Sequence, residues 1–298
     1  MRSKRIFALL LAFILLCCAL CSCGAPDASP EEPNTPVEVI SEPEAETSGN
    51  YIIRLTGDLP DGEKELDLEA LEQDFSGPYS VINNWPSKKF AAAEGVTVKS
   101  ILEAAGALDT FQQITVTSTD GYCMSFTRDQ VLVDRWYYPG LMEDDTSNAA
   151  KAPMILALRY TTDGADAVPE AVKTTLVFGQ EDIFEHNTPA FVEDVAEICI
   201  SNEDPGQWEP ATSFPAPGEI AAGELVKLQH NYAGLAKLYY TTDGSAPTYE
   251  RAMYNPSTYQ PEVNVPIEVT EDTVIKVIVR GYGHNDSDIA ELAFTVNG

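Results

Sequence analysis

The chain has 298 residues, 44% of them hydrophobic, with 19 Gly and 20 Pro. This composition is typical of a globular protein with one or two cores, and it excludes a wholly disordered chain. The chain carries 47 Asp and Glu against 18 Lys and Arg, a formal net charge of −29 at pH 7. So acidic a surface repels nucleic acid and anionic lipid headgroups, which excludes both as partners.

The N-terminus predicts an export signal over residues 1–22. Three basic residues within the first five positions precede an unbroken apolar run from Ile6 to Ala19, which is too short to span a bilayer comfortably. The run ends in Leu20-Cys21-Ser22-Cys23, which resembles the bacterial lipoprotein cleavage box. That resemblance implies that Cys23 is lipidated and becomes the new N-terminus, so that the protein is anchored in the cell envelope, on the extracytoplasmic side of the membrane. A plain signal peptide is the alternative, and the Leu-x-Ser-Cys order argues against it.

Residues 23–50 predict an acidic, Pro-rich tether. After Cys23 this segment has no Lys, Arg or aromatic residue, so burial cannot offset the entropy lost on ordering it. A flexible coil of this length reaches roughly 30 Å on average. Removal of residues 1–22 leaves 15 Lys and Arg against 47 Asp and Glu, a formal charge of −32. Solubility at an exposed surface is the simplest explanation of that acidity.

Residues 51–204 predict a domain in which strands alternate with short helices, of the α+β class. The stretches 51–57 and 113–118 have the composition of strands. Three residues have the position of a helix N-cap, and the third begins a capping box with Gln130: Asp67, Thr97 and Thr127. Gly106 ends the second helix.

The run "YTTDG" occurs at Tyr160–Gly164 and again at Tyr240–Gly244. The first copy lies between two apolar strands of the predicted α+β domain, and the second lies among the short strands of a segment without helical periodicity. Asp-Gly commonly ends a strand because Gly adopts the positive φ that such turns require. We therefore interpret the two copies as convergent turns rather than as a tandem repeat.

A Pro-rich linker at 205–212 precedes an all-β segment, residues 213–298. Its runs "LYYTTDGSAPT" and "PIEVTEDTVIKVIVRGYGHNDSD" resemble the chitobiase/β-hexosaminidase C-terminal domain family. The resemblance implies an immunoglobulin-like sandwich that serves as a non-catalytic accessory module. Five tyrosines offer rings on which a sugar could stack, with core packing as the alternative: Tyr239, Tyr240, Tyr249, Tyr254 and Tyr259.

Residues 51–202 resemble the molybdopterin-binding domain of the sulfite oxidase fold. The resemblance rests on "GVTVKSILEAAG", "ITVTSTDGYCMSFT" and "LVFGQEDIFEHNTPAFVEDVAEICI", in that order. It implies a molybdenum centre held by a cysteine thiolate before the first of these motifs, where "YSVINNWPSKKFAAAEGV" has no cysteine. The basic residues that would neutralise the cofactor phosphate are also few, because Thr175 and Ala190 occupy positions where Arg or Lys is expected and only Lys88, Lys89 and Lys173 remain.

We therefore expect no cofactor, with molybdopterin as the alternative, and no metal site. The cofactor cleft of such a domain, reused for a small polar ligand, would be lined by Asn83, Asn84, Trp85, Lys88, Lys89, Asp120, Tyr122, Gln180 and Asn187. The leading hypothesis is a lipid-anchored, non-catalytic binding or scaffold protein, whose partner is a small ligand, a glycan or a surface protein. The alternatives are a molybdopterin-dependent oxidoreductase with atypical ligation and a glycan-binding surface protein.

Two cysteines remain after the lipidated one, Cys123 and Cys199, both in strand-like stretches. Outside the cytoplasm they could form a disulfide, and the alternative is two separately buried thiols. The three histidines, His186, His230 and His284, are far apart in sequence and have no spaced partner that would indicate zinc.

The anchor is testable through its thiol. Because lipidation requires the Cys23 sulfur, Cys23→Ser should release the protein from membranes or leave its signal uncleaved. Detergent partitioning and the mass of the mature N-terminus measure this. Unchanged partitioning of the Cys23→Ser protein would contradict the lipoprotein hypothesis.

Overall fold

The computed structural model describes residues 51–85, 87–232, 236–249, 252–255 and 264–297. All of these residues belong to one compact unit, 47–298. The predicted signal and the whole of the tether, including Cys23, lie outside the described residues, as does Tyr259. Below, residues 51–204 are called the N-terminal half and residues 205–297 the C-terminal half.

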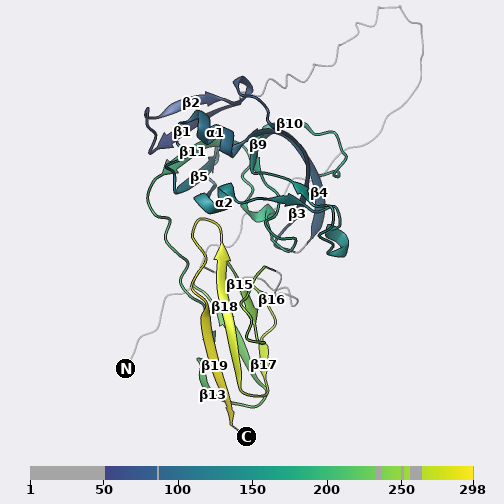
Figure 1. Cartoon of the computed structure of the whole chain (residues 1–298), viewed down its shortest axis with the longest axis vertical. Coiled ribbons are helices and arrows are strands. Elements are labelled where there is room, and N and C mark those ends of the chain that lie inside the picture. The colour runs from purple at the N-terminus through teal and green to yellow at the C-terminus, as the bar shows by residue number, and fades with distance from the viewer. Residues whose placement is uncertain (1–50, 86, 233–235, 250–251, 256–263, 298) are drawn as a thin grey trace, which may run out of the picture. The chain divides into compact units, whose positions relative to one another are not determined.

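The N-terminal half contains two main sheets (Figure 1). The first is, in spatial order, β2 (Lys64–Asp67), β1 (Ile52–Gly57), β11 (Val195–Ser201), β5 (Gln113–Ser118) and β6 (Cys123–Thr127). The second is β10 (Glu170–Val177), β9 (Ile155–Thr161), β4 (Lys88–Thr97) and β3 (Phe75–Ile82). A small ladder joins β7 (Trp136–Tyr137) to β8 (Ala150–Lys151).

The helices of this half are short. Besides α1 (Val98–Ala104) and α2 (Arg128–Leu132), there are single 3-10 turns at η1 (Leu68–Ala70), η2 (Leu141–Glu143) and η3 (Thr188–Ala190). The cap predictions for Thr97 and Thr127 are confirmed, since each hydroxyl accepts from the backbone N–H three residues on, and the Gln130 side chain completes the capping box. The half is therefore richer in strand than the α+β class that we predicted.

The helix expected after Asp67 is only the 3-10 turn η1. Asp67 does cap it, accepting from Glu69 N at 3.0 Å. However, residues 64–67 pair with β1 as the antiparallel strand β2, with Asp67 opposite Ile52. Residues 64–67 thus form a strand rather than part of a helix. The chain that follows Asp67 has too little apolar surface to sustain a longer helix.

The largest core of the N-terminal half lies against the first sheet. It includes the fully buried Ile53, Leu55, Ile101, Phe126 and Phe178. A second cluster, around Tyr79 and Ile155, lies against the second sheet. The alternation of buried and exposed residues along β5 shows why this sequence forms a sheet with one face in a core.

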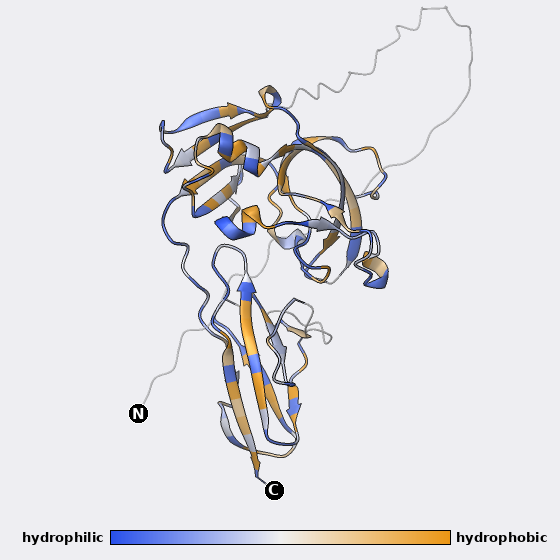
Figure 2. Cartoon of the chain, viewed as in Figure 1, coloured by the Kyte–Doolittle hydropathy of each residue, from blue (hydrophilic) through white to orange (hydrophobic). Residues whose placement is uncertain are grey.

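The C-terminal half is an immunoglobulin-like β sandwich, as predicted. One sheet is β12 (Thr212–Phe214), β14 (Glu224–Gln229) and β17 (Ile267–Val269). The other is β13 (Gly218–Ala221), β19 (Ala290–Asn297), β18 (Thr273–Gly281), β15 (Ala236–Thr241) and β16 (Ala252–Tyr254). Every second side chain of β18 from Ile275 to Val279 is buried, and most of this strand is coloured hydrophobic in Figure 2.

The two "YTTDG" runs end strands of different sheets. Thr161 is the last residue of β9 and Thr241 is the last residue of β15. Gly164 and Gly244 both have positive φ. The interpretation of these runs as convergent turns is confirmed.

The turn that follows β18, residues 281–285, contacts the N-terminal half. The Gln130 side chain accepts from Gly283 N at 3.0 Å and donates to the carbonyl oxygens of Gly281 and His284, at 2.9 and 3.1 Å. The Tyr282 ring packs against Phe126, with ring centroids 5.3 Å apart. Gln130, which completes the capping box of α2, therefore also bonds the turn after β18.

The close approach of β4 to β9 at Gly95, where the register of the two strands shifts, allows a stability prediction. A Cβ on Gly95 would lie 2.1 Å from the Leu156 carbonyl oxygen and 2.8 Å from Ala157 Cα, which are backbone atoms of the neighbouring β9. Gly95→Ala should therefore lower the free energy of unfolding by about 3 kcal/mol, measured by chemical denaturation.

Gly77→Ala is the matched control on β3. A Cβ there would meet only the movable Phe75 ring, at 3.1 Å, so the loss should be clearly smaller. Equal losses for the two variants would contradict the assignment of strain to the β4–β9 contact.

Candidate functional site

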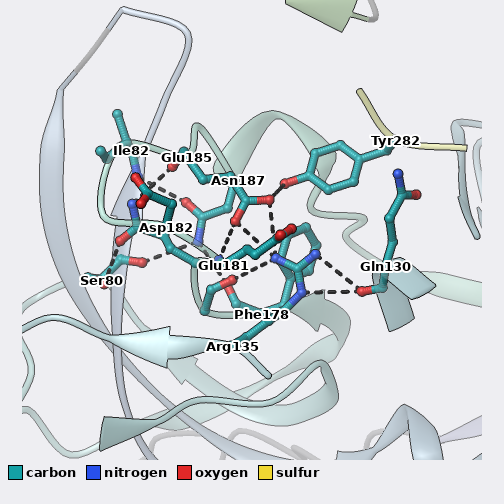
Figure 3. A network of polar contacts seen from close by, with 12 residues as sticks. Ser80, Ile82, Gln130, Arg135, Phe178, Glu181, Asp182, Glu185, Asn187 and Tyr282 are labelled. Atoms are coloured by element: carbon teal, nitrogen blue, oxygen red, sulfur yellow. Dashed lines mark hydrogen bonds and ion pairs between the residues drawn. The ribbon is translucent and has the colours of Figure 1, made fainter. Parts of the chain in front are cut away.

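The residues of the predicted cofactor cleft do not form one cleft. Gln180 and Asn187 are fully buried and bonded to protein groups (Figure 3). Asn187 accepts from Ile82 N at 3.0 Å and donates to the carbonyl oxygens of Ser80 and Phe178. Gln180 accepts from the Ser80 hydroxyl at 2.6 Å and donates to the carbonyl oxygens of Ile183 and Glu185. Both amides satisfy buried backbone groups and have no free atom to offer a ligand.

Most of the other cleft residues are engaged locally or face solvent. Lys88 forms an ion pair with Asp144, Lys89 is exposed on β4, and Trp85 is 64% exposed. Asn83 accepts from Trp85 N and Ser87 N in a local turn, at 2.9 and 3.0 Å. The placement of these residues in one ligand cleft is therefore wrong.

Asp120 also closes a local turn. Tyr122 and Asn84 both lie at a cavity. Asp120 accepts from Tyr122 N at 3.0 Å. The Tyr122 hydroxyl donates to Pro189 O at 3.1 Å. Of the nine predicted residues, Tyr122 and Asn84 line a cavity that the sequence did not predict.

This cavity has a volume of about 250 Å³ and is bounded by both halves of the compact unit. Its wall from the N-terminal half contains Asn84, Tyr122, Met124, Glu185, His186, Pro189 and Ala190. Its wall from the C-terminal half contains Lys237, Tyr239, Tyr249, Arg280, Gly281 and Tyr282. Apolar and aromatic surface with a few convergent polar groups is typical of small-molecule sites.

Glu185 belongs to a buried network rather than acting as a free carboxylate (Figure 3). Its side chain accepts from Arg135 Nη1 at 3.1 Å and from the Tyr282 hydroxyl at 2.7 Å. The Arg135 guanidinium also donates to Gln130 O and lies over the Phe178 ring, 4.7 Å from its centroid. Burial and the adjacent Glu185 charge raise the pKa of Tyr282 well above its ordinary value, so this phenol stays a donor. Because Arg135 neutralises Glu185, the network adds no net charge to the cavity wall.

Two cations occupy the opposite wall, on neighbouring strands. Lys237 of β15 stands directly opposite Arg280 of β18 in the antiparallel register. Arg280 pairs with Asp286 at 2.7 Å and lies over the Tyr249 ring, 4.2 Å from its centroid. No described residue forms an ion pair or hydrogen bond with the Lys237 ammonium, and burial lowers the pKa of Lys237.

His186 lines the cavity and is neutral at pH 7. Its Nδ1 is buried and has no hydrogen-bond partner among the described residues. Burial, with a smaller contribution from the Lys237 charge, lowers the pKa of His186 to about 4. The imidazole therefore adds no charge to the cavity wall at pH 7.

The tyrosines considered as sugar platforms take other positions. Tyr239 and Tyr254 are 2% exposed. Tyr239 and Tyr249 pack edge to face, 5.0 Å between ring centroids, and both line the cavity. Tyr240 is half-buried on β15. These four rings do not form an exposed stacking platform.

The disulfide suggested for Cys123 and Cys199 is absent, since both thiols are free. β5 lies between β6, which begins at Cys123, and β11, which contains Cys199, so the two cysteines are two strands apart. At an inter-strand spacing of about 4.8 Å this separation is too great for a disulfide without movement of the backbone. The alternative of two buried thiols is also wrong for Cys123, which is exposed.

Within the part of the chain that the structure describes, no group of three or more His, Cys, Asp and Glu side chains is arranged to hold a metal ion. No helix among these residues is long and apolar enough to cross a bilayer.

Residues 215–291 match the chitobiase/beta-hexosaminidase C-terminal domain family, which confirms the resemblance of the C-terminal half. No curated protein matches the chain. Among solved structures, the sulfane dehydrogenase SoxCD from Paracoccus pantotrophus is similar at a TM-score of 0.31 and 12% identity, covering 79% of this chain and 68% of that one. A TM-score this low supports no conclusion about fold or function.

The cavity histidine predicts a pH dependence of stability. Its pKa is about 4 in the folded protein and near its ordinary value of 6.5 in the unfolded chain. The unfolded state therefore binds the extra proton first, and stability from this group is lost as the pH falls from 6.5 to 4, with no further loss below 4.

His186→Gln should remove this contribution. Between pH 6 and 4.5, the free energy of unfolding of the variant should fall with a slope smaller by about one proton than that of the wild type. Denaturant titrations at several pH values measure both slopes. Equal slopes would show that His186 is not held neutral in the fold.

Proposed function

We propose that the protein is a non-catalytic binding protein, held at the extracytoplasmic face of the membrane through Cys23, that retains a small ligand in the cavity bounded by its two halves. The observation that carries this proposal is the convergence of Lys237, Arg280 and His186 on one cavity with aromatic walls. A few convergent polar groups on apolar walls give a ligand its orientation and most of its buried surface.

The lining residues support binding over nucleophilic catalysis. The described wall contains no Ser, Thr or Cys that His186 could activate. Its carboxylate, Glu185, is already bonded to Arg135 and Tyr282. We assign Lys237, Arg280 and His186 a role in holding a ligand in place.

A sulfite-oxidase-like N-terminal half remains part of the proposal, supported by the order of its motifs. The residues present do not fit a molybdopterin. Cys123 alternates with Met124 along β6, so its side chain points away from the face that lines the cavity. Lys88 and Lys173 are paired with Asp144 and Asp194, which leaves few free cations for a phosphate. We assign no reaction step to that cofactor.

Filling the cavity tests the binding function. Met124→Trp enlarges a side chain on the cavity wall, whereas Met142→Trp makes the same change at an exposed position outside it. Ligand-observed NMR with a library of small polar fragments should detect binders of the wild type and of Met142→Trp. The same fragments should lose binding to Met124→Trp while that variant still unfolds cooperatively.

Two outcomes would contradict the proposal. The first is a set of fragments that bind Met124→Trp as well as the wild type, which would place the site elsewhere. The second is about one molybdenum per chain in protein made by a host that synthesises the cofactor, since one metal per chain would indicate the oxidoreductase alternative.

A further inference from the structure

We propose that the ligand is a small organic monoanion, a carboxylate that lies between Lys237 and Arg280 with its carbon skeleton against the tyrosines of the cavity. This inference rests on the proposed function and names the chemical class of its ligand. It is argued from the charges of the wall, the strand register and the walls' composition.

Among the described residues that line the cavity, one cation has no ion-pair partner. Glu185 is paired with Arg135, and Arg280 with Asp286. His186 is neutral at pH 7. The remaining charge among these lining residues is that of Lys237, while Glu181, outside the lining, adds a further acid near Arg135 and Arg280. A single negative charge on the ligand pairs with Lys237, whereas a dianion would leave a charge unpaired in a desolvated place.

Burial makes Lys237 costly in the empty protein. Lys237 stands directly opposite Arg280 in the strand register, where Cβ atoms are about 5 Å apart, and Arg280 is already paired with Asp286. The cost at Lys237 is therefore the partial desolvation of an ammonium that has no ion-pair partner among the described residues. A neutral side chain would be more stable at this position, so the lysine is explained by what it binds rather than by folding.

The other lining residues favour a ligand whose anionic group is attached to a carbon skeleton. Met124, Pro189 and Ala190 are apolar, and Tyr239, Tyr249 and Tyr282 contribute ring surface. Inorganic sulfate or phosphate would leave this surface uncovered. A volume of about 250 Å³ restricts the ligand to a small molecule of the size of a simple aromatic or aliphatic acid.

The probes for the experiment are benzoate and phenylacetate, each paired with its neutral amide, measured by calorimetry on the full-length protein. Both acids should bind at least about tenfold more tightly than their amides, because only the acids offset the Lys237 charge. Lys237→Met keeps the length and apolar stem but removes the charge. It should weaken binding of the acids to the level of the amides.

Lys227→Met is the matched control, since Lys227 is exposed on β14 and outside the cavity wall. It should bind the acids as the wild type does. Without ligand, Lys237→Met should unfold at the same temperature as the wild type or higher, because a desolvated charge is removed. This second readout also shows that the variant is folded.

Several results would overturn the inference. They are equal affinities for acids and amides, undiminished binding of the acids to Lys237→Met, and no binding of either acid. If the amides or other neutral fragments still bind and Met124→Trp abolishes that binding, the monoanion inference fails while the proposed function stands. If no compound binds in the cavity, both fail.

Discussion

The buried ion pair of Arg135 and Glu185, closed by the Tyr282 hydroxyl, is the interaction on which the cavity depends. Its members come from the segment after α2, the loop after β10 and the turn after β18, so one network joins three distant segments. Removal of one partner from a buried pair leaves an uncompensated charge, at a cost of about 3–5 kcal/mol. The turn after β18 is thus held against the N-terminal half, and with it the end of β18, where Arg280 lies.

The second attachment of that turn uses a helix cap. Gln130 completes the capping box of α2, and the same side chain bonds Gly281, Gly283 and His284. A change that loosened the cap would therefore also loosen the sandwich. The part of the cavity wall at Gly281 and Tyr282 is therefore held by hydrogen bonds from the N-terminal half, so its ordering does not have to accompany binding.

Local signals in the sequence were sufficient for the caps at Thr97 and Thr127, the turns after β9 and β15, and the sandwich, since each depends on neighbours within a few residues. These local signals failed where a segment distant in the sequence determines the structure. Pairing with β1 takes residues 64–67, only a 3-10 turn follows Asp67, and the side-chain amide of Asn187 bonds the buried backbone carbonyl groups of Ser80 and Phe178. A polar residue beside a motif serves a ligand or a buried carbonyl equally well, and only the fold shows which.

The cavity itself had no sequence signature, because Glu185, Lys237 and Arg280 are far apart in the chain and share no spacing. What distinguishes them is energetic. Lys237 is desolvated, has no ion-pair partner among the described residues and lowers the pKa of His186. One bound anion would pair with the Lys237 ammonium and offset the cost of its desolvation. Unfavourable features that a single ligand could relieve together are more informative about a site than any one polar residue near a familiar motif.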